Sequence, residues 1–220
     1  MTTTTAEIRT FHARRGRIGV RRRDLLERLG PRYGVSESGG PADPAAWYGR
    51  RAPLVLEIGS GMGDATAAMA SADPDRNYLA AEVHSAGVAN LLGLIEQHGL
   101  TNLRVCHGDA LSLLRERLAP ASLDAVHAFF PDPWPKARHH KRRLFQPGHV
   151  ALLRSRLRPG GVIYTVTDWA AYADVIQHTL GADPGLALTQ PPGGRPVTRY
   201  EQRALTAGRQ IFEFAARRLD

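Results

Sequence analysis

The chain has 220 residues, of which 43% are hydrophobic, and it carries a formal net charge of +8 with a sequence pI near 10.3. This length suits one domain with a core of its own, and the excess of cations favours a polyanionic partner. No run approaches the ~20 apolar residues of a membrane span, no secretory signal is visible at the start, and the single cysteine, Cys106, cannot form an internal disulfide. We therefore expect a cytoplasmic protein that does not bind a membrane.

Residues 1–50 differ in amino-acid composition from the remainder of the chain. Arginines are dense between Arg9 and Arg32, and a stretch rich in glycine, proline and serine follows them. Two interpretations stay open: a disordered tail with a basic bias, or an arm that contacts phosphates. We expect residues 1–50 to form a basic arm and linker, and residues 51–220 to form the main domain.

From residue 53 onward, segments typical of strands alternate with segments typical of helices. The expected strands are 53–59, 77–83, 102–108, 122–130, 162–167 and 209–216, and the expected helices are 64–72, 88–99, 110–119, 148–157, 168–180 and one that starts at Tyr200. Such alternation predicts an α/β fold, with a parallel sheet and helices on both of its faces.

A glycine-rich turn, Gly59 to Gly63, lies between the first expected strand and the first expected helix. Doubly wound folds bind their ligands at this place. A dinucleotide fingerprint would have a small residue where Asp64 stands, because an acid in the first helical turn repels a pyrophosphate. Glu57, before the turn, is equally unfavourable to phosphates but is suited to a ligand ammonium. A nicotinamide oxidoreductase is therefore disfavoured.

Three acids stand near the ends of three successive expected strands: Glu57, Glu82 and Asp109. Singly, each could be a helix N-cap or a turn acid. S-adenosylmethionine carries an ammonium, a ribose diol and an adenine amino group, but no phosphate. Together with the glycine turn, the three acids favour a methyltransferase that uses this cofactor. The nine histidines and one cysteine show no metal-ligand spacing, and we expect no metal site.

The segment 129–143, FFPDPWPKARHHKRR, is the most distinctive in the chain. Asp132 stands between two prolines, which restrict its backbone, and Trp134 and a run of cations follow. Lys136 and Lys141 are the only lysines among 29 basic residues. This suggests that the function of this segment requires a compact ammonium group and not the planar guanidinium of arginine. A stiffly held acid, a stacking surface and an anion-binding run would suit a guanine in a nucleic acid. The alternative is a proline-rich turn followed by a solvated basic loop.

These motifs resemble those of the bacterial tRNA (guanine-N7)-methyltransferases, and the resemblance spans nearly the whole chain. The matching stretches are LEIGSGMG, AEVHSAGV, GDA, FFPDPWPKARHHKRRL, the TDW at 167–169 and the RPVTRYEQR at 195–203. The glycine motif is shared by many methyltransferases, whereas the PDPW run is highly specific. The resemblance implies a doubly wound, mostly parallel seven-stranded sheet of the class I methyltransferase type with a basic N-terminal extension. It also implies methyl transfer from S-adenosylmethionine to N7 of guanine 46 in the tRNA variable loop.

Methylation at N7 leaves the purine positively charged, and we expect Asp132 to be the catalytic residue that stabilises this charge. The resemblance also implies roles for individual residues. Cofactor contacts fall on Glu57, Gly59, Glu82, Asp109 and Asp132. Substrate contacts fall on Lys136, Asp168, Thr198, Arg199, Tyr200 and Glu201, and RNA contacts on Arg138, His139, His140, Lys141, Arg142 and Arg143. Tyr200 stands where phenylalanine is frequent, and the RRRDLL after Gly19 departs from the family pattern. Two alternatives remain: a methyltransferase for another RNA base, or a non-catalytic RNA-binding protein on this scaffold. The sequence leaves the choice between monomer and homodimer open.

Overall fold

The computed structural model describes residues 8–11 and 18–220. Within them, eight strands form one sheet in the order β1-β4-β3-β2-β5-β6-β8-β7. Their bounds are β1 Gly34–Val35, β2 Leu54–Ile58, β3 Asn77–Glu82, β4 Leu103–His107, β5 Leu123–Phe129, β6 Leu157–Thr167, β7 Leu186–Thr189 and β8 Phe212–Arg218. Neighbouring strands from β1 to β6 are parallel, whereas β8 lies antiparallel between β6 and β7.

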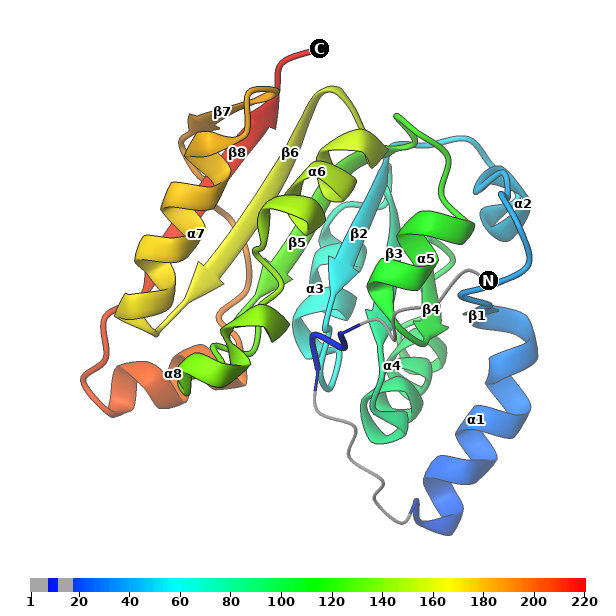
Figure 1. The fold of residues 1–220 in the computed structure, drawn as a ribbon. Coiled ribbons are helices and arrows are strands. Elements are labelled where there is room, and N and C mark those ends of the chain that lie inside the picture. Colours follow the sequence, from blue (N-terminus) through cyan, green and yellow to red (C-terminus); the bar gives the residue numbers. More distant parts are fainter. Residues whose placement is uncertain (1–7, 12–17) are drawn as a thin grey trace, which may run out of the picture.

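Helices cover both faces of the sheet (Figure 1). Their bounds are α1 Val20–Tyr33, α2 Ala45–Tyr48, α3 Asp64–Ala72, α4 Ser85–Gln97, α5 Ala110–Glu116, α6 Pro147–Arg156, α7 Ala170–Ala182 and α8 Arg199–Thr206, with a 3-10 helix η1 at Ala137–Arg142. Side chains from α5, α6 and α7 pack into one hydrophobic cluster, and side chains from α1, α3 and α4 pack into a second. Because both faces are covered, the central strands β2 and β3 are almost continuously buried.

The doubly wound, mostly parallel sheet predicted from the sequence is confirmed, and α3 has the bounds expected for it. The sheet has eight strands where seven were expected. Six strand ranges were expected from the sequence itself, and the two short strands outside them are β1, which pairs with β4, and β7, which pairs with β8. Two- and four-residue strands carry too little alternation to be recognised in a sequence, because their place depends on the neighbour with which they pair.

Part of the expected N-terminal arm is built into the domain. Helix α1 packs on α4, where Leu29 is buried and the guanidinium of Arg28 makes a two-point ion pair with the carboxylate of Glu96. β1 then extends the sheet. Residues 1–7 and 12–17 of the expected arm lie outside the described residues, and a phosphate-contacting role for the arm stays a prediction.

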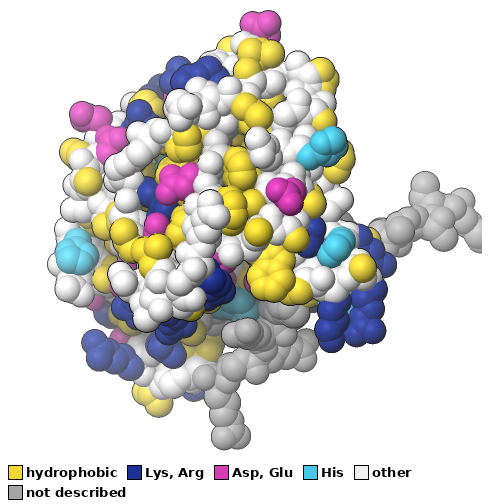
Figure 2. Space-filling view, turned by 90° about the vertical axis from the view of Figure 1, so that its left-hand side faces the viewer, with side chains coloured by type: hydrophobic (Ala, Val, Ile, Leu, Met, Phe, Trp, Pro, Cys, Tyr) yellow, Lys and Arg dark blue, Asp and Glu magenta, His cyan; other side chains and the backbone are white. Residues whose placement is uncertain are grey.

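The order of the strands places a crevice at the carboxyl edge of the sheet. After β2 the chain adds β3 and β4 on one side and then returns to add β5 on the other, so that the direction of winding reverses between β2 and β5. Ligands of open α/β sheets bind at this switch point. Figure 2 shows several Lys and Arg side chains gathered along the lower part of one side of the molecule, toward this edge.

Among residues 8–11 and 18–220, no helix combines the length and the apolar character needed to cross a bilayer.

Candidate active site

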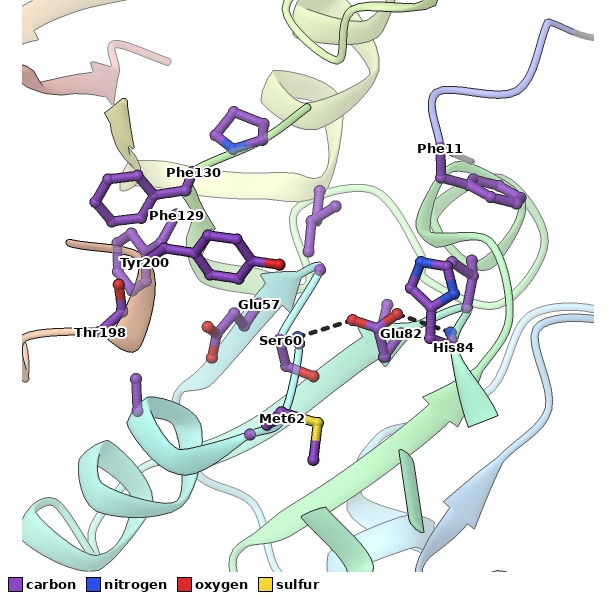
Figure 3. Close-up of a pocket in the computed structure, with 18 of the residues that line it drawn as sticks. Phe11, Glu57, Ser60, Met62, Glu82, His84, Phe129, Phe130, Thr198 and Tyr200 are labelled. Atoms are coloured by element: carbon purple, nitrogen blue, oxygen red, sulfur yellow. Dashed lines mark hydrogen bonds between the residues drawn. The ribbon is translucent and has the colours of Figure 1, made fainter. Parts of the chain in front are cut away.

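A cavity of about 470 Å³ opens at the carboxyl edge of the sheet, at the switch point. Its walls come from the segments that follow four successive strands and from two segments near the ends of the chain. The lining comprises residues 57–65, 81–84, 108–110, 129–132 and 196–200, with Thr10, Phe11, Leu144 and Arg203. Figure 3 shows side chains from several of these segments around one space. The cavity therefore gathers the four acids that the sequence placed at strand ends.

The glycine turn between β2 and α3 is shaped by close backbone approaches. Gly61 has a φ of 58°, in the left-handed region that favours glycine. Gly87, in the first turn of α4, lies against this turn, because a Cβ added to it would stand 2.0 Å from the carbonyl oxygen of Gly61. The turn is thus fixed between α3 and α4, with Gly59 at the cavity wall.

Glu57, in β2, is a buried carboxyl group that faces the cavity, with 3% of its surface exposed (Figure 3). Among the described residues its Oε2 has no hydrogen-bond partner, and neither does the nearby Oγ of Ser60. Burial, together with the charge of Glu82, raises the pKa of Glu57 to about 7. A cationic ligand in the cavity would supply the partner that this carboxylate lacks.

Glu82, at the end of β3, is held by two backbone donors. Its Oε2 accepts a hydrogen bond from the Gly61 N–H and its Oε1 accepts one from the His84 N–H, each at 2.7 Å (Figure 3). The carboxylate is therefore fixed in orientation beside the glycine turn. Each oxygen keeps a lone pair with which it can accept a further hydrogen bond, as from a vicinal diol.

Asp109 is the N-cap of α5, and its Oδ1 accepts a hydrogen bond from the Leu111 N–H at 3.0 Å. Its own N–H donates to the carboxylate of Glu37, from the loop after β1. Gly108 leaves room for this contact, because a Cβ there would stand 2.2 Å from Glu37 Oε2. Sequence reasoning missed Glu37, since no motif marks an acid that reaches its partner across 72 positions.

Asp132 lies at the exposed rim of the cavity, in the loop that follows β5. The backbone on both sides of it is unusual, because Phe130 has a φ of 53° and Trp134 a φ of 45°. Bulky residues seldom adopt this region unless the surroundings enforce it. Here the Phe130 N–H donates to the Val166 carbonyl oxygen at 2.8 Å, and Arg143 Nε donates to the Pro133 carbonyl oxygen at 2.8 Å. The loop is therefore rigidly supported on both sides of Asp132.

Trp134 was expected to offer a surface on which a base could stack, but in the structure it is not available for stacking. Its side chain is buried, with 2% exposed. The indole Nε1 donates to the Thr10 carbonyl oxygen, and the guanidinium of Arg142 lies 4.1 Å from the centre of the ring. The aromatic rings that line the cavity are instead Phe11, Phe129, Phe130 and Tyr200, and Tyr200 is 65% exposed at its mouth.

The basic run divides into exposed and structural members. Lys136, Arg138 and Lys141 are exposed, and His139 and His140 are half-buried. Arg142 donates to the carbonyl oxygens of Arg9 and Phe11, both at 3.0 Å. Arg143 is 3% exposed, and its guanidinium lies over the ring of Tyr172. The expected contact between Arg143 and RNA does not fit this burial, because the guanidinium already binds the Pro133 carbonyl oxygen and packs on Tyr172.

The remaining expected substrate residues lie at the start of α8 and, for Asp168, directly after β6. Thr198 is the N-cap of α8 and forms a capping box with Glu201, which is buried and paired with Arg195. Arg199 Nη2 stands 3.2 Å from Asp64 Oδ1, at the surface. Asp168 pairs with Arg209 at 2.7 Å. The cavity lining includes Thr198, Arg199 and Tyr200 but not Asp168 or Lys136.

Solved structures share this fold. The 16S rRNA methyltransferase KamB has a TM-score of 0.55 with this chain at 12% identity, and the match covers 79% of this chain and 91% of that one. The [4+2]-cyclase SpnF has a TM-score of 0.54 at 16% identity, covering 89% and 93%. Since a methyltransferase and a cyclase both appear, this likeness shows the fold alone.

The sequence comparisons are more specific. Residues 51–214 match the model of the family described as "Putative methyltransferase". The tRNA (guanine-N(7)-)-methyltransferases of Streptomyces avermitilis and Nitrosospira multiformis are each 48% identical to this chain over 96% of its length, and the matches cover 76% and 94% of those proteins. These findings confirm that the protein is a methyltransferase, as the sequence predicted. The chain belongs to the tRNA (guanine-N(7)-)-methyltransferase family.

Proposed function

We propose that this enzyme transfers a methyl group from S-adenosylmethionine to N7 of guanine 46 in the variable loop of tRNA, in the cytoplasm. The observation that carries the proposal is the convergence of Glu57, Glu82, Asp109 and Asp132 on one cavity at successive strand ends. Such a site rejects phosphates and suits a cofactor whose polar groups are mostly donors. The relatives named for guanine-N7 methylation of tRNA support the substrate. The resemblance of the PDPW segment to that family supports position 46.

The donors and acceptors of the cavity fit S-adenosylmethionine. The orphaned Oε2 of Glu57 and Oγ of Ser60 are suited to its ammonium group. Glu82, already fixed by two backbone donors, would accept from the ribose hydroxyls, and Asp109 from the adenine amino group. When bound, this cofactor supplies an electrophilic methyl group on a sulfonium. The protein has to bind the two reactants, hold them in line and stabilise the charge that develops on the base.

Guanine N7 carries a free lone pair, and therefore the transfer needs no general base. Transfer would form the carbon–nitrogen bond as the carbon–sulfur bond of the donor breaks, so the purine ring would carry the positive charge that the site has to stabilise. Asp132 would hold the guanine through its N1–H and exocyclic amine and would stabilise the positive charge as it develops. The supported loop on either side of Asp132 contributes by keeping the two reactants in line.

Exposed cations beside the cavity would bind the RNA backbone. Lys136, Arg138 and Lys141 extend from η1 and the segment before it, with the half-buried His139 and His140 among them. Figure 2 shows Lys and Arg side chains along the lower part of the molecule, toward the carboxyl edge of the sheet, and such side chains would attract an RNA backbone. Arg142 and Arg143 would act indirectly, by holding the loop that presents Asp132.

The direct test is methylation of bulk tRNA from a strain without N7-methylguanine, with isotopically labelled S-adenosylmethionine. Borohydride reduction and aniline treatment then cleave the RNA at any N7-methylguanine. We expect incorporation of label and a single cut in the variable loop. Incorporation without a cut would show another methylated base, and a cut elsewhere would overturn the assignment to position 46.

A further inference from the structure

The part of the cavity wall formed by residues 196–200 has little intrinsic support. Residues 190–198, between β7 and α8, form no regular secondary structure, and Gly193 and Gly194 both have positive φ values. Yet Pro196, Val197 and Thr198, at the end of this segment, line the cavity. A glycine pair with left-handed backbone, which does not itself fix the path of the chain, therefore precedes residues that line the cavity.

Helix α8 continues this wall and is held by few apolar contacts. Of its eight residues only Glu201 and Ala204 are buried. One alanine and one carboxylate cannot anchor a helix through the hydrophobic effect, because the apolar area that they remove from water is small. The anchor must lie in the partners of Glu201.

Arg195 supplies that anchor. Its side chain is 6% exposed, and its guanidinium makes a two-point ion pair with the Glu201 carboxylate, with Nη2 at 2.8 Å from Oε1. The same Nη2 donates to Glu213 Oε1, in β8, at 2.6 Å. One buried cation thus connects α8 with a strand of the sheet.

The connection reaches further into the sheet. Glu213 Oε2 accepts a hydrogen bond from the Tyr164 hydroxyl of β6 at 2.6 Å. The guanidinium of Arg195 also lies 5.7 Å from the centre of the Phe129 ring, and Phe129 lines the cavity. Glu201 in turn closes the capping box with Thr198 that begins α8. The position of the Thr198 end of the helix is therefore fixed through Arg195.

We propose that Arg195 is a positioning residue, which holds Pro196–Tyr200 against β6 and β8 so that this wall can receive the substrate base. The inference rests on the proposed function and extends it to a residue that does not itself touch the ligands. A planar guanidinium fork is needed, because a lysine ammonium cannot bind two carboxylates with the same geometry. In this role Arg195 affects turnover with tRNA more than affinity for the cofactor.

The test compares Arg195→Gln with Arg154→Gln. Arg154 makes a similar, partly buried ion pair with Asp183 (2.7 Å) at the opposite edge of the sheet, which makes it a control for the general loss of a salt bridge. We expect Arg195→Gln to lower kcat/KM for tRNA about 100-fold, since small displacements of reacting groups have effects of this size. The Kd for S-adenosylhomocysteine should change by less than about threefold, and Arg195→Lys should recover part of the loss.

A second readout makes the inference independent of the substrate. Amide hydrogen exchange over residues 198–206 should accelerate in Arg195→Gln and stay unchanged in Arg154→Gln. Equal exchange in the two variants would overturn the positioning role, and so would faster exchange with unchanged kcat/KM. If the wild-type enzyme does not methylate tRNA, the proposed function fails, while the exchange measurement still decides whether Arg195 holds the wall.

Discussion

The indole Nε1 of Trp134 donates a hydrogen bond to the carbonyl oxygen of Thr10 at 3.1 Å, across 124 positions of the chain. Arg142, which stacks on the same indole, donates to the carbonyl oxygens of the residues on either side of Thr10. Thr10 and Phe11 line the cavity. The loop that presents Asp132 therefore also fastens an N-terminal segment at the mouth of the site.

Trp134→Phe should remove the hydrogen bond to the Thr10 carbonyl oxygen while keeping an aromatic ring in place. Loss of one hydrogen bond predicts a decrease of about 1 kcal/mol in the free energy of unfolding, measured by urea titration. Because Thr10 and Phe11 are cavity residues, affinity for S-adenosylhomocysteine should fall as well. Trp47→Phe is the matched control, since the Trp47 indole makes no hydrogen bond with another described residue; an equal effect in both variants would contradict the fastening role.

The division of the basic run predicts different consequences for neighbouring cations. Lys141→Ala should weaken tRNA binding and reduce the slope of log K against log salt by about 1, with no change in thermal stability. Arg143→Met should instead lower the free energy of unfolding by about 2 kcal/mol, because a buried hydrogen bond to Pro133 and the contact with Tyr172 are lost. Binding assays at several salt concentrations and melting curves separate the two. The opposite pattern would return Arg143 to the RNA-contacting set.

The raised pKa of Glu57 predicts pH-dependent cofactor binding. With a pKa of about 7 in the free enzyme, most Glu57 is protonated at pH 6 and ionised at pH 8. A ligand ammonium binds the ionised form, and affinity for S-adenosylhomocysteine should rise about tenfold over this range, with proton uptake by buffer below pH 7. Calorimetry in buffers of different ionisation enthalpy measures both effects. Glu57→Gln should abolish the pH dependence, and the exposed Glu116→Gln should leave it intact.

The raised pKa of Glu57 also predicts how the stability of the fold depends on pH. A carboxyl group whose folded pKa lies above its unfolded value binds more protons in the folded state, so its contribution to stability is present at low pH and is lost as pH rises toward 7. Glu57→Gln should therefore be more stable than the wild type at pH 8, although it binds the cofactor poorly. A lower melting temperature for the variant at pH 8 would contradict the buried, unpaired state of this group.

Asp132→Asn tests the residue on which transfer is expected to depend. The amide keeps the size of the side chain but removes the charge and one of the two acceptors for the guanine. We expect kcat to fall by at least about 100-fold, as when a preorganised electrostatic partner of a transition state is removed. Cofactor affinity should change only moderately. Asp75→Asn, an exposed acid in the turn before β3, is the control.

What the sequence could predict here depends on how local the signal is. The ends of β2, β3, β4 and β5 are recognisable in the sequence, because an apolar run with an acid at or near its end is contained within a few residues. The burial of Trp134 and Arg143 was not, since it depends on Thr10 and on Tyr172, which the fold brings from elsewhere. Glu37 illustrates the same limit, because an acid in a short loop has no pattern until its partner, the Asp109 N–H, is known.

β8 follows β7 in the chain but lies between β6 and β7 in the sheet. During synthesis, β7 therefore has no strand to pair with until β8 has left the ribosome. The parallel strands that carry the four acids can assemble earlier, whereas the Arg195–Glu213 contact must wait for the final strand. The cavity wall at Pro196–Tyr200 is therefore the last part of the site to be anchored to the sheet.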